Sequence, residues 1–149
     1  MSVGMNARLS SFPIIICVAA AAFAVGAPAA AQGTLPEAAE RARQAWLAHN
    51  PQALVGQSPS LVLQIPGADP SSPVGRAQAV ELLRRYLRPV EERGLDVTVI
   101  REVEPGKGFV ELARRYVVVG TTELRRETLF LGFRLQDGRW ALAELRSAP

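Results

Sequence analysis

Apolar and polar residues follow two different rhythms along this chain. Over 35–49 and 76–90 the apolar positions recur at helical spacing, which predicts two amphipathic helices. Pro36 beside Glu37 is typical of a helix start, and Asn50-Pro51 ends the first helix. The first part of the chain is therefore expected to be mainly helical.

Shorter elements are expected between these helices. Residues 52–56 predict a short helical piece or a turn, and the brief apolar run 60–65 predicts a strand. The stretch 66–75 is rich in Pro, Ser and Gly and has no periodicity, so we expect an irregular loop there.

From residue 95 onward the alternation changes to every second residue, which predicts strands. The expected strands cover 95–104, 109–119, 122–135 and 139–145. Asp137-Gly138 between two alternating runs is a strong signal for a tight hairpin. The sequence thus predicts an α+β fold in which N-terminal helices pack on a curved, mainly antiparallel sheet.

The turns also predict which residues face each other. Closed with the shortest loops, they set three cross-strand pairs: Val103 with Val110, Val118 with Glu123, and Leu135 with Trp140. One face then gathers apolar side chains for the core. These are Leu95, Val97, Val99, Val103, Val110, Leu112, Val118, Leu129, Leu131, Phe133, Leu135, Trp140 and Leu142.

Polar residues interrupt this predicted core face: Arg101, Arg114, Tyr116, Glu127 and Glu144. In the same register Arg114 faces Glu127, and Arg125 lies beside Tyr116. Buried charges are costly unless they are paired or solvated, so the polar group predicts either a cross-strand ion-pair ladder or the wall of a cavity. The candidate pocket wall consists of Tyr86, Arg101, Arg114, Tyr116 and Glu127.

The opposite face of the sheet mixes charged and apolar residues. It is expected to carry Ile100, Phe109, Val117 and Phe130 among the charges, together with Leu124 and Leu145. A second copy of the chain could cover such a face in a homodimer, so we take the first four as the candidate dimer face. Scattered surface apolar residues that need no partner are the alternative.

The first 31 residues have the three parts of a secretory signal peptide. Arg8 gives a positive start, 12–26 is apolar, and 29–31 is a small-residue end of the A-x-A type. We therefore expect export to the periplasm or the outside, with cleavage near Ala31 and a single domain over 32–149. The alternative is that this segment is retained as a membrane anchor. We expect no other contact of the chain with a membrane.

The composition of the chain limits the kinds of partner and of binding site that we expect. The formal net charge is only +3 and the chain is expected to be exported, so we expect no nucleic-acid partner. Lys107 is the single lysine, and the arginine pairs at 84–85, 114–115 and 125–126 could suggest a phosphate-binding face, but a bias toward Arg explains them as well. The single cysteine, Cys17, lies inside the predicted signal peptide, and His49 is the single histidine. These counts predict no metal site and no cofactor.

Four segments carry a resemblance to a known superfamily. They read AWLAHNPQAL over 45–54, LVLQIPG over 61–67, GRAQAVELLRRYL over 75–87, and DGRWALAELR over 137–146. In this order, across 35–146, they resemble the nuclear transport factor 2-like superfamily, a cone-shaped α+β fold of cystatin-like type. Within it the chain looks most similar to exported bacterial domains of unknown function.

The resemblance implies a fold and leaves two hypotheses for the function. Ketosteroid isomerase, an enzymatic member, carries its carboxylate base at a position that Ile65 occupies here. We therefore expect a non-catalytic module that binds a small apolar or anionic molecule or associates with itself or another protein. The alternative is a lyase, isomerase or hydrolase that uses Tyr86, Arg114, Tyr116 or Glu127 as acid–base or electrostatic groups.

Overall fold

A computed structural model describes residues 33–149, so the predicted signal peptide lies outside the described residues. The helices are α1 (Leu35–Leu47), α2 (Pro51–Val55) and α3 (Arg76–Leu87). The strands are β1 (Ser60–Gln64), β2 (Val74–Gly75), β3 (Val90–Glu104), β4 (Lys107–Val118), β5 (Arg125–Gln136) and β6 (Arg139–Ala148). Within this range no helix has the length and apolar character needed to cross a bilayer.

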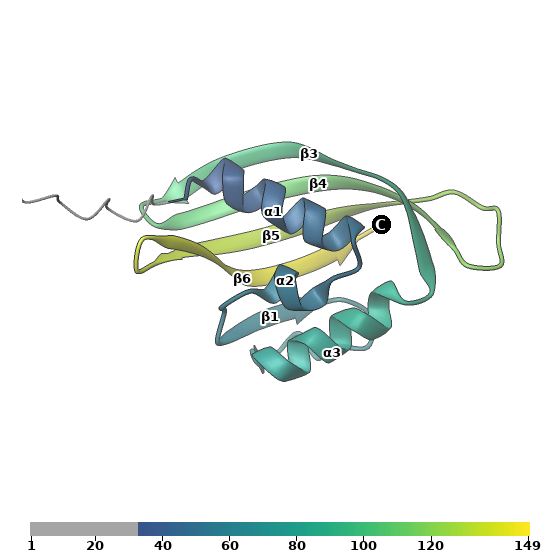
Figure 1. The fold of residues 1–149 in the computed structure, drawn as a ribbon, viewed down its shortest axis with the longest axis horizontal. Coiled ribbons are helices and arrows are strands. Elements are labelled where there is room, and N and C mark those ends of the chain that lie inside the picture. Colours follow the sequence, from purple (N-terminus) through teal and green to yellow (C-terminus); the bar gives the residue numbers. More distant parts are fainter. Residues whose placement is uncertain (1–32) are drawn as a thin grey trace, which may run out of the picture.

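All six strands form one sheet in the order β2-β1-β6-β5-β4-β3 (Figure 1). The last four strands are a meander of antiparallel hairpins, whereas β1 runs parallel to β6. Figure 1 shows α1 and α2 lying across one face of the sheet, with α3 beside β1. The predicted α+β fold with a curved, mainly antiparallel sheet is confirmed.

Local sequence signals define where α1 begins. Thr34 caps the helix: its hydroxyl accepts a hydrogen bond from the backbone N–H of Glu37, and the Glu37 carboxylate accepts one from the N–H of Thr34. Pro36 fits the first turn because it has no N–H to leave unpaired. The buried stripe of this helix ends with Trp46, which points into the core.

The core lies between the helices and the sheet face that carries Val110, Leu112, Leu129 and Leu131, which we call the inner face. Their side chains are 0 to 2% exposed. We call the other side, which carries Glu111 and Phe130, the outer face. Because side chains alternate along a strand, every position on β4 and β5 belongs to one of these two environments.

Two of the three predicted registers are confirmed. Arg114 pairs with Glu127 and Tyr116 with Arg125, as the pairing of Val118 with Glu123 implied, and Leu135 pairs with Trp140. The predicted β3–β4 register was wrong, because Ile100 rather than Val103 lies opposite Val110. The hairpin closes tightly around Pro105-Gly106, where Gly106 has a φ of +76°. The offset is an odd number of residues, so it exchanges the two faces at the end of β3.

β-Bulges account for the other corrections. In β3 an irregularity between Val97 and Val99 keeps Val97 on the inner face and turns Val99 to the outer face. A second one, opposite Gly132 and Phe133, places Leu145 in the core and exposes Glu144, the reverse of the prediction. Strict alternation cannot reveal such insertions. Val103 and Leu135, predicted as core residues, lie at the ends of β3 and β5 and are 51% and 43% exposed.

Candidate functional site

A buried arginine is the centre of the candidate site. Arg114 lies on the inner face of β4, between Leu112 and Tyr116, and is 1% exposed. Its Nη2 is 2.6 Å from an oxygen of Glu92 on β3, and its Nη1 is 2.7 Å from an oxygen of Glu127 on β5. Nε also donates to both oxygens of Glu92, at 3.1 Å. One guanidinium thus joins three neighbouring strands.

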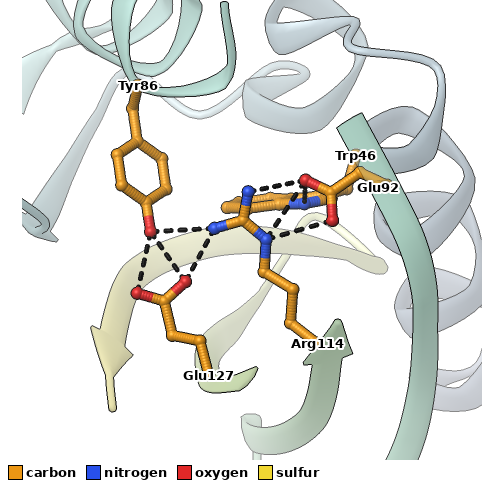
Figure 2. A network of polar contacts seen from close by, with 5 residues as sticks. All are labelled: Trp46, Tyr86, Glu92, Arg114 and Glu127. Carbon is orange, nitrogen blue, oxygen red and sulfur yellow. Dashed lines mark hydrogen bonds and ion pairs between the residues drawn. The ribbon is translucent and has the colours of Figure 1, made fainter. Parts of the chain in front are cut away.

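Two aromatic side chains from the helices complete the network (Figure 2). The Tyr86 hydroxyl, from α3, accepts a hydrogen bond from Nη1 of Arg114 at 2.9 Å and donates to the Glu127 carboxylate at 2.8 Å. The indole Nε1 of Trp46, from α1, donates to Glu92 at 3.0 Å. The helices are therefore held to the sheet by hydrogen bonds as well as by apolar packing.

Aromatic rings surround the same guanidinium. Its central carbon lies 4.1 Å from the ring centroid of Tyr116, 4.9 Å from Trp46 and 5.2 Å from Tyr86. The negative faces of such rings attract a cation, and the attraction is stronger where water is excluded. Arg114 thus occupies an aromatic cage built from its own chain.

Burial and hydrogen bonding shift the pKa values of two members of the network, Arg114 and Tyr86. Burial opposes the charge of Arg114, but hydrogen bonding to Glu92 and its negative charge outweigh this and raise the arginine pKa. Burial raises the pKa of Tyr86 to about 12, so its hydroxyl stays protonated at neutral pH. Across 33–149 no buried side-chain nitrogen or oxygen lacks a hydrogen-bond partner. The network is chemically satisfied and offers no idle acid or base.

A cavity of about 370 Å³ lies beside the network. Tyr86, Arg114 and Tyr116 form part of its wall, and the exposed side chain of Arg85 stands at its edge. The rest of the lining is mainly apolar and comes from the loop after β1, from α3 and from the paired ends of β3 and β4: Pro66, Gly67, Leu82, Pro89, Val90 and Val118. The size and the mostly apolar lining suit a small organic molecule.

Four of the five predicted pocket residues do come together, namely Tyr86, Arg114, Tyr116 and Glu127. The prediction that Arg101 lines the pocket was wrong, because the shifted β3–β4 register turns its side chain to the outer face.

Sequence reasoning missed Glu92 and Trp46. Glu92 was missed because β3 begins at Val90 rather than near residue 95. Residues 91–93 are all charged and show no apolar alternation, so no pattern in the sequence extends the strand backward to Glu92. Trp46 was assigned to the apolar stripe of its helix, which gave no reason to expect a hydrogen bond from its indole.

The outer face carries a row of stacked side chains that we call the Arg–Phe row. Arg101 lies over the ring of Phe109 at 5.2 Å, Phe109 packs on Phe130 at 6.0 Å, and Arg146 lies over Phe130 at 4.4 Å. These four residues come from the four neighbouring strands β3 to β6.

One member of the candidate dimer face was misplaced, and a second lies on the predicted face but is buried. Ile100 pairs with the buried Val110 and so belongs to the inner side of the sheet. Val117 is only 6% exposed, so little of its surface is left for a partner. Phe109 and Phe130 are the members of that set that remain on the outer face and partly accessible.

Comparisons with known proteins bear on the fold. No sequence-family profile matches the chain, and no curated protein matches it by sequence. A ketosteroid isomerase-like protein from Erwinia carotovora superposes with a TM-score of 0.63 at 17% identity, over 77% of this chain and 95% of the other. A protein of ketosteroid isomerase-like fold from Catenulispora acidiphila, in complex with trimethylamine, gives 0.59 at 18% identity, over 78% and 87%.

A cystatin-like domain of unknown function from Nostoc punctiforme gives a TM-score of 0.54 at 12% identity, over 74% of this chain and 72% of that one. At these identities the likeness concerns the arrangement of helices and strands and not the chemistry of a site. The chain therefore has the nuclear transport factor 2-like fold, in the form also described as ketosteroid isomerase-like or cystatin-like.

Proposed function

We propose that this chain is an exported, non-catalytic binding domain that holds a small, mainly apolar molecule in the cavity beside Tyr86. The observation that carries the proposal is the juxtaposition of that cavity of about 370 Å³ with a rigid polar network. Apolar walls supply affinity by burial, and a few fixed polar groups orient a guest.

The state of the polar groups favours binding over catalysis. A general base needs a free carboxylate, but Glu127 accepts hydrogen bonds from both Arg114 and Tyr86. A general acid needs a pKa near the working pH, and that of Tyr86 is raised to about 12. Ile65, which stands where the isomerase resemblance expects a base, is 5% exposed and belongs to the core.

The charge around the cavity favours a neutral or anionic guest. Trimethylamine is bound in the Catenulispora protein of similar fold. In this chain the rings that could enclose such a cation already surround Arg114. Arg85 adds a second positive group at the edge of the cavity. Both guanidinium groups are paired with carboxylates, but no acidic side chain lines the cavity, so a cationic amine would find no free counter-ion there.

Native mass spectrometry of the protein purified from its own cells tests the proposal. We expect a bound small molecule that is released on denaturation. Leu82→Trp should lose it, because Leu82 lines the cavity and the larger ring would fill it. Arg84→Trp is the matched control, since Arg84 lies on the same helix outside the cavity lining. A wild-type protein without a guest, or a guest retained in Leu82→Trp, would contradict the proposal.

Export rests on the sequence pattern of residues 1–31. The mass of the same purified protein tests it directly, because cleavage after Ala31 leaves Gln32 as the first residue. An intact Met1 terminus on protein from the cell envelope would favour the retained anchor instead.

Self-association through the outer face is the second proposal, supported by the Arg–Phe row. Phenylalanine and arginine are residue types enriched at protein interfaces, and Glu111 lies beside Phe130 on the same face. We propose a two-fold dimer in which the guanidinium groups of one copy face Glu111 of the other.

Sedimentation of the wild type and of Phe130→Asp tests self-association. We expect a dimer that dissociates in the variant, while Leu124→Asp, at an exposed position in the β4–β5 connection, keeps the dimer mass. An unchanged solution mass for Phe130→Asp would contradict the proposal.

A further inference from the structure

A second cavity, of about 450 Å³, lies at the opposite end of the sheet from the Tyr86 cavity. It lies between the helix pair α1 and α2 and the β5–β6 hairpin, where β6 begins at Arg139. The Tyr86 cavity instead lies where Val90 pairs with Val118. The two cavities share no lining residue.

Small residues on the helices leave this space open. The helical side of the wall carries Ala38, Ala42 and Ala53, followed by Leu54 and Val55, and the sheet side carries Phe133 and Trp140. Larger aliphatic residues at the alanine positions would extend across the gap toward the sheet and close it. The cavity is thus a consequence of the alanines in α1 and α2, and its surface is mainly apolar.

The charged residues in the lining are both arginines, Arg41 on α1 and Arg139 on β6. Arg41 is exposed and forms no ion pair with any residue in the range 33–149. No acidic residue lines the cavity. The Arg41 guanidinium therefore has donors free for a guest, and its planar fork matches a carboxylate.

We propose that this cavity binds an amphipathic carboxylate, with the apolar part between the alanines and Trp140 and the carboxylate on Arg41. The volume lies within the ordinary range for small-molecule sites of about 300–1,000 Å³. Burial of the apolar part provides most of the attraction, and the ion pair at the exposed rim sets the orientation. The site is independent of the guest proposed for the Tyr86 cavity.

Calorimetric titration of the purified protein with sodium decanoate tests this site, and decanol provides the same apolar chain without the charge. We expect decanoate to bind about tenfold more tightly than decanol, and Arg41→Gln to remove that preference. Arg85→Gln is the matched control, because Arg85 stands at the other cavity. Equal affinity for decanoate and decanol in the wild type would overturn the carboxylate assignment.

Filling variants place the binding at one cavity or the other. Ala53→Trp should abolish decanoate binding, and Gln52→Trp, at the adjacent exposed position outside the lining, should leave it unchanged. Ala53 is itself exposed, so the larger side chain need not disturb the core. Leu82→Trp should also leave decanoate binding unchanged. Absence of decanoate binding, or its loss in Leu82→Trp but not in Ala53→Trp, would overturn the proposal.

Discussion

Two adjacent arginines on β4 experience opposite environments. Arg114 points to the inner face and is 1% exposed, with carboxylate oxygens at 2.6 and 2.7 Å. Arg115 points to the outer face, where its side chain is 46% exposed and lies 3.2 Å from Asp96, itself 67% exposed. The two side chains have the same charge and leave neighbouring backbone positions, so the face of the sheet accounts for the difference between them.

The two arginines differ in the state of the partner carboxylates that would remain if the arginine were removed. A surface ion pair exchanges water for a partner at little net gain. A buried pair has already lost its water, so removing one member exposes the other to a low dielectric without compensation. Arg114 forms ion pairs with two carboxylates and Arg115 with one, and the inner-face group also forms hydrogen bonds with side chains of two helices.

Arg114→Ala should have the largest effect. It leaves Glu92 and Glu127 close together without their shared cation, and breaking a buried pair in this way costs about 3–5 kcal/mol. Urea unfolding of the purified protein measures the loss of stability. Arg114→Lys keeps the charge but not the five-donor fork, so we expect it to recover only part of the loss. A cost below about 1 kcal/mol for Arg114→Ala would show that the buried network is not stabilised through Arg114.

The loss of stability on replacing Glu92 or Glu127 should depend on how deeply each carboxylate is buried and on how many hydrogen bonds it accepts. The Glu92 side chain is 4% exposed and accepts hydrogen bonds from Trp46 and from Nε and Nη2 of Arg114, whereas that of Glu127 is 12% exposed. We expect Glu92→Gln to cost about 2 kcal/mol and Glu127→Gln about 1 kcal/mol. The same unfolding titration checks the order. A larger loss for Glu127→Gln would mean that the contact with Tyr86 matters more than burial.

The sequence predicted the Glu127 half of this network and missed the Glu92 half for a physical reason. The β4–β5 register follows from alternation together with a short turn at Gly120-Thr121, so Arg114, Tyr116 and Glu127 could be placed on one face from the sequence. Glu92 depends on where β3 begins and on a bulge near Gly94, and neither leaves a mark in the apolar pattern.

The cavities could not be predicted in the same way. They depend on space left between helix and sheet, as at Ala42 and Ala53, and on how far each side chain extends. Alternation assigns a residue to a face but does not say whether the facing layer is filled. The fold was therefore predictable from the order of the elements and the spacing of their apolar residues. The cavity volumes at the two ends of the sheet were not.

Tyr86→Phe should have a smaller effect of about 1 kcal/mol, because it removes one hydroxyl and leaves both carboxylates on Arg114. The wild type should also show a pH dependence that this variant lacks. Since the folded-state pKa is raised from 10.0 to about 12, the unfolded chain releases this proton first. The contribution of the protonated Tyr86 hydroxyl to the stability of the fold is thus fully present below pH 10 and is lost as the pH rises from 10 to about 12.

The tyrosinate absorbance can follow that ionisation. The chain has two tyrosines, so Tyr116→Phe leaves Tyr86 as the one phenol to titrate. We expect its midpoint near pH 12 in the folded protein and near 10 in urea. A folded-state midpoint near 10 would mean that the hydroxyl is open to water and that the network is looser than its distances indicate.

Arg115→Ala should have the smallest effect and completes the comparison within β4. Its ion pair with Asp96 is exposed on both sides, so we expect a loss of about 0–1 kcal/mol in urea unfolding. Added salt should shrink that loss further, because exposed charges are screened, while the cost of Arg114→Ala should change little. If Arg115→Ala cost as much as Arg114→Ala, the face of the sheet would not be what separates these two arginines.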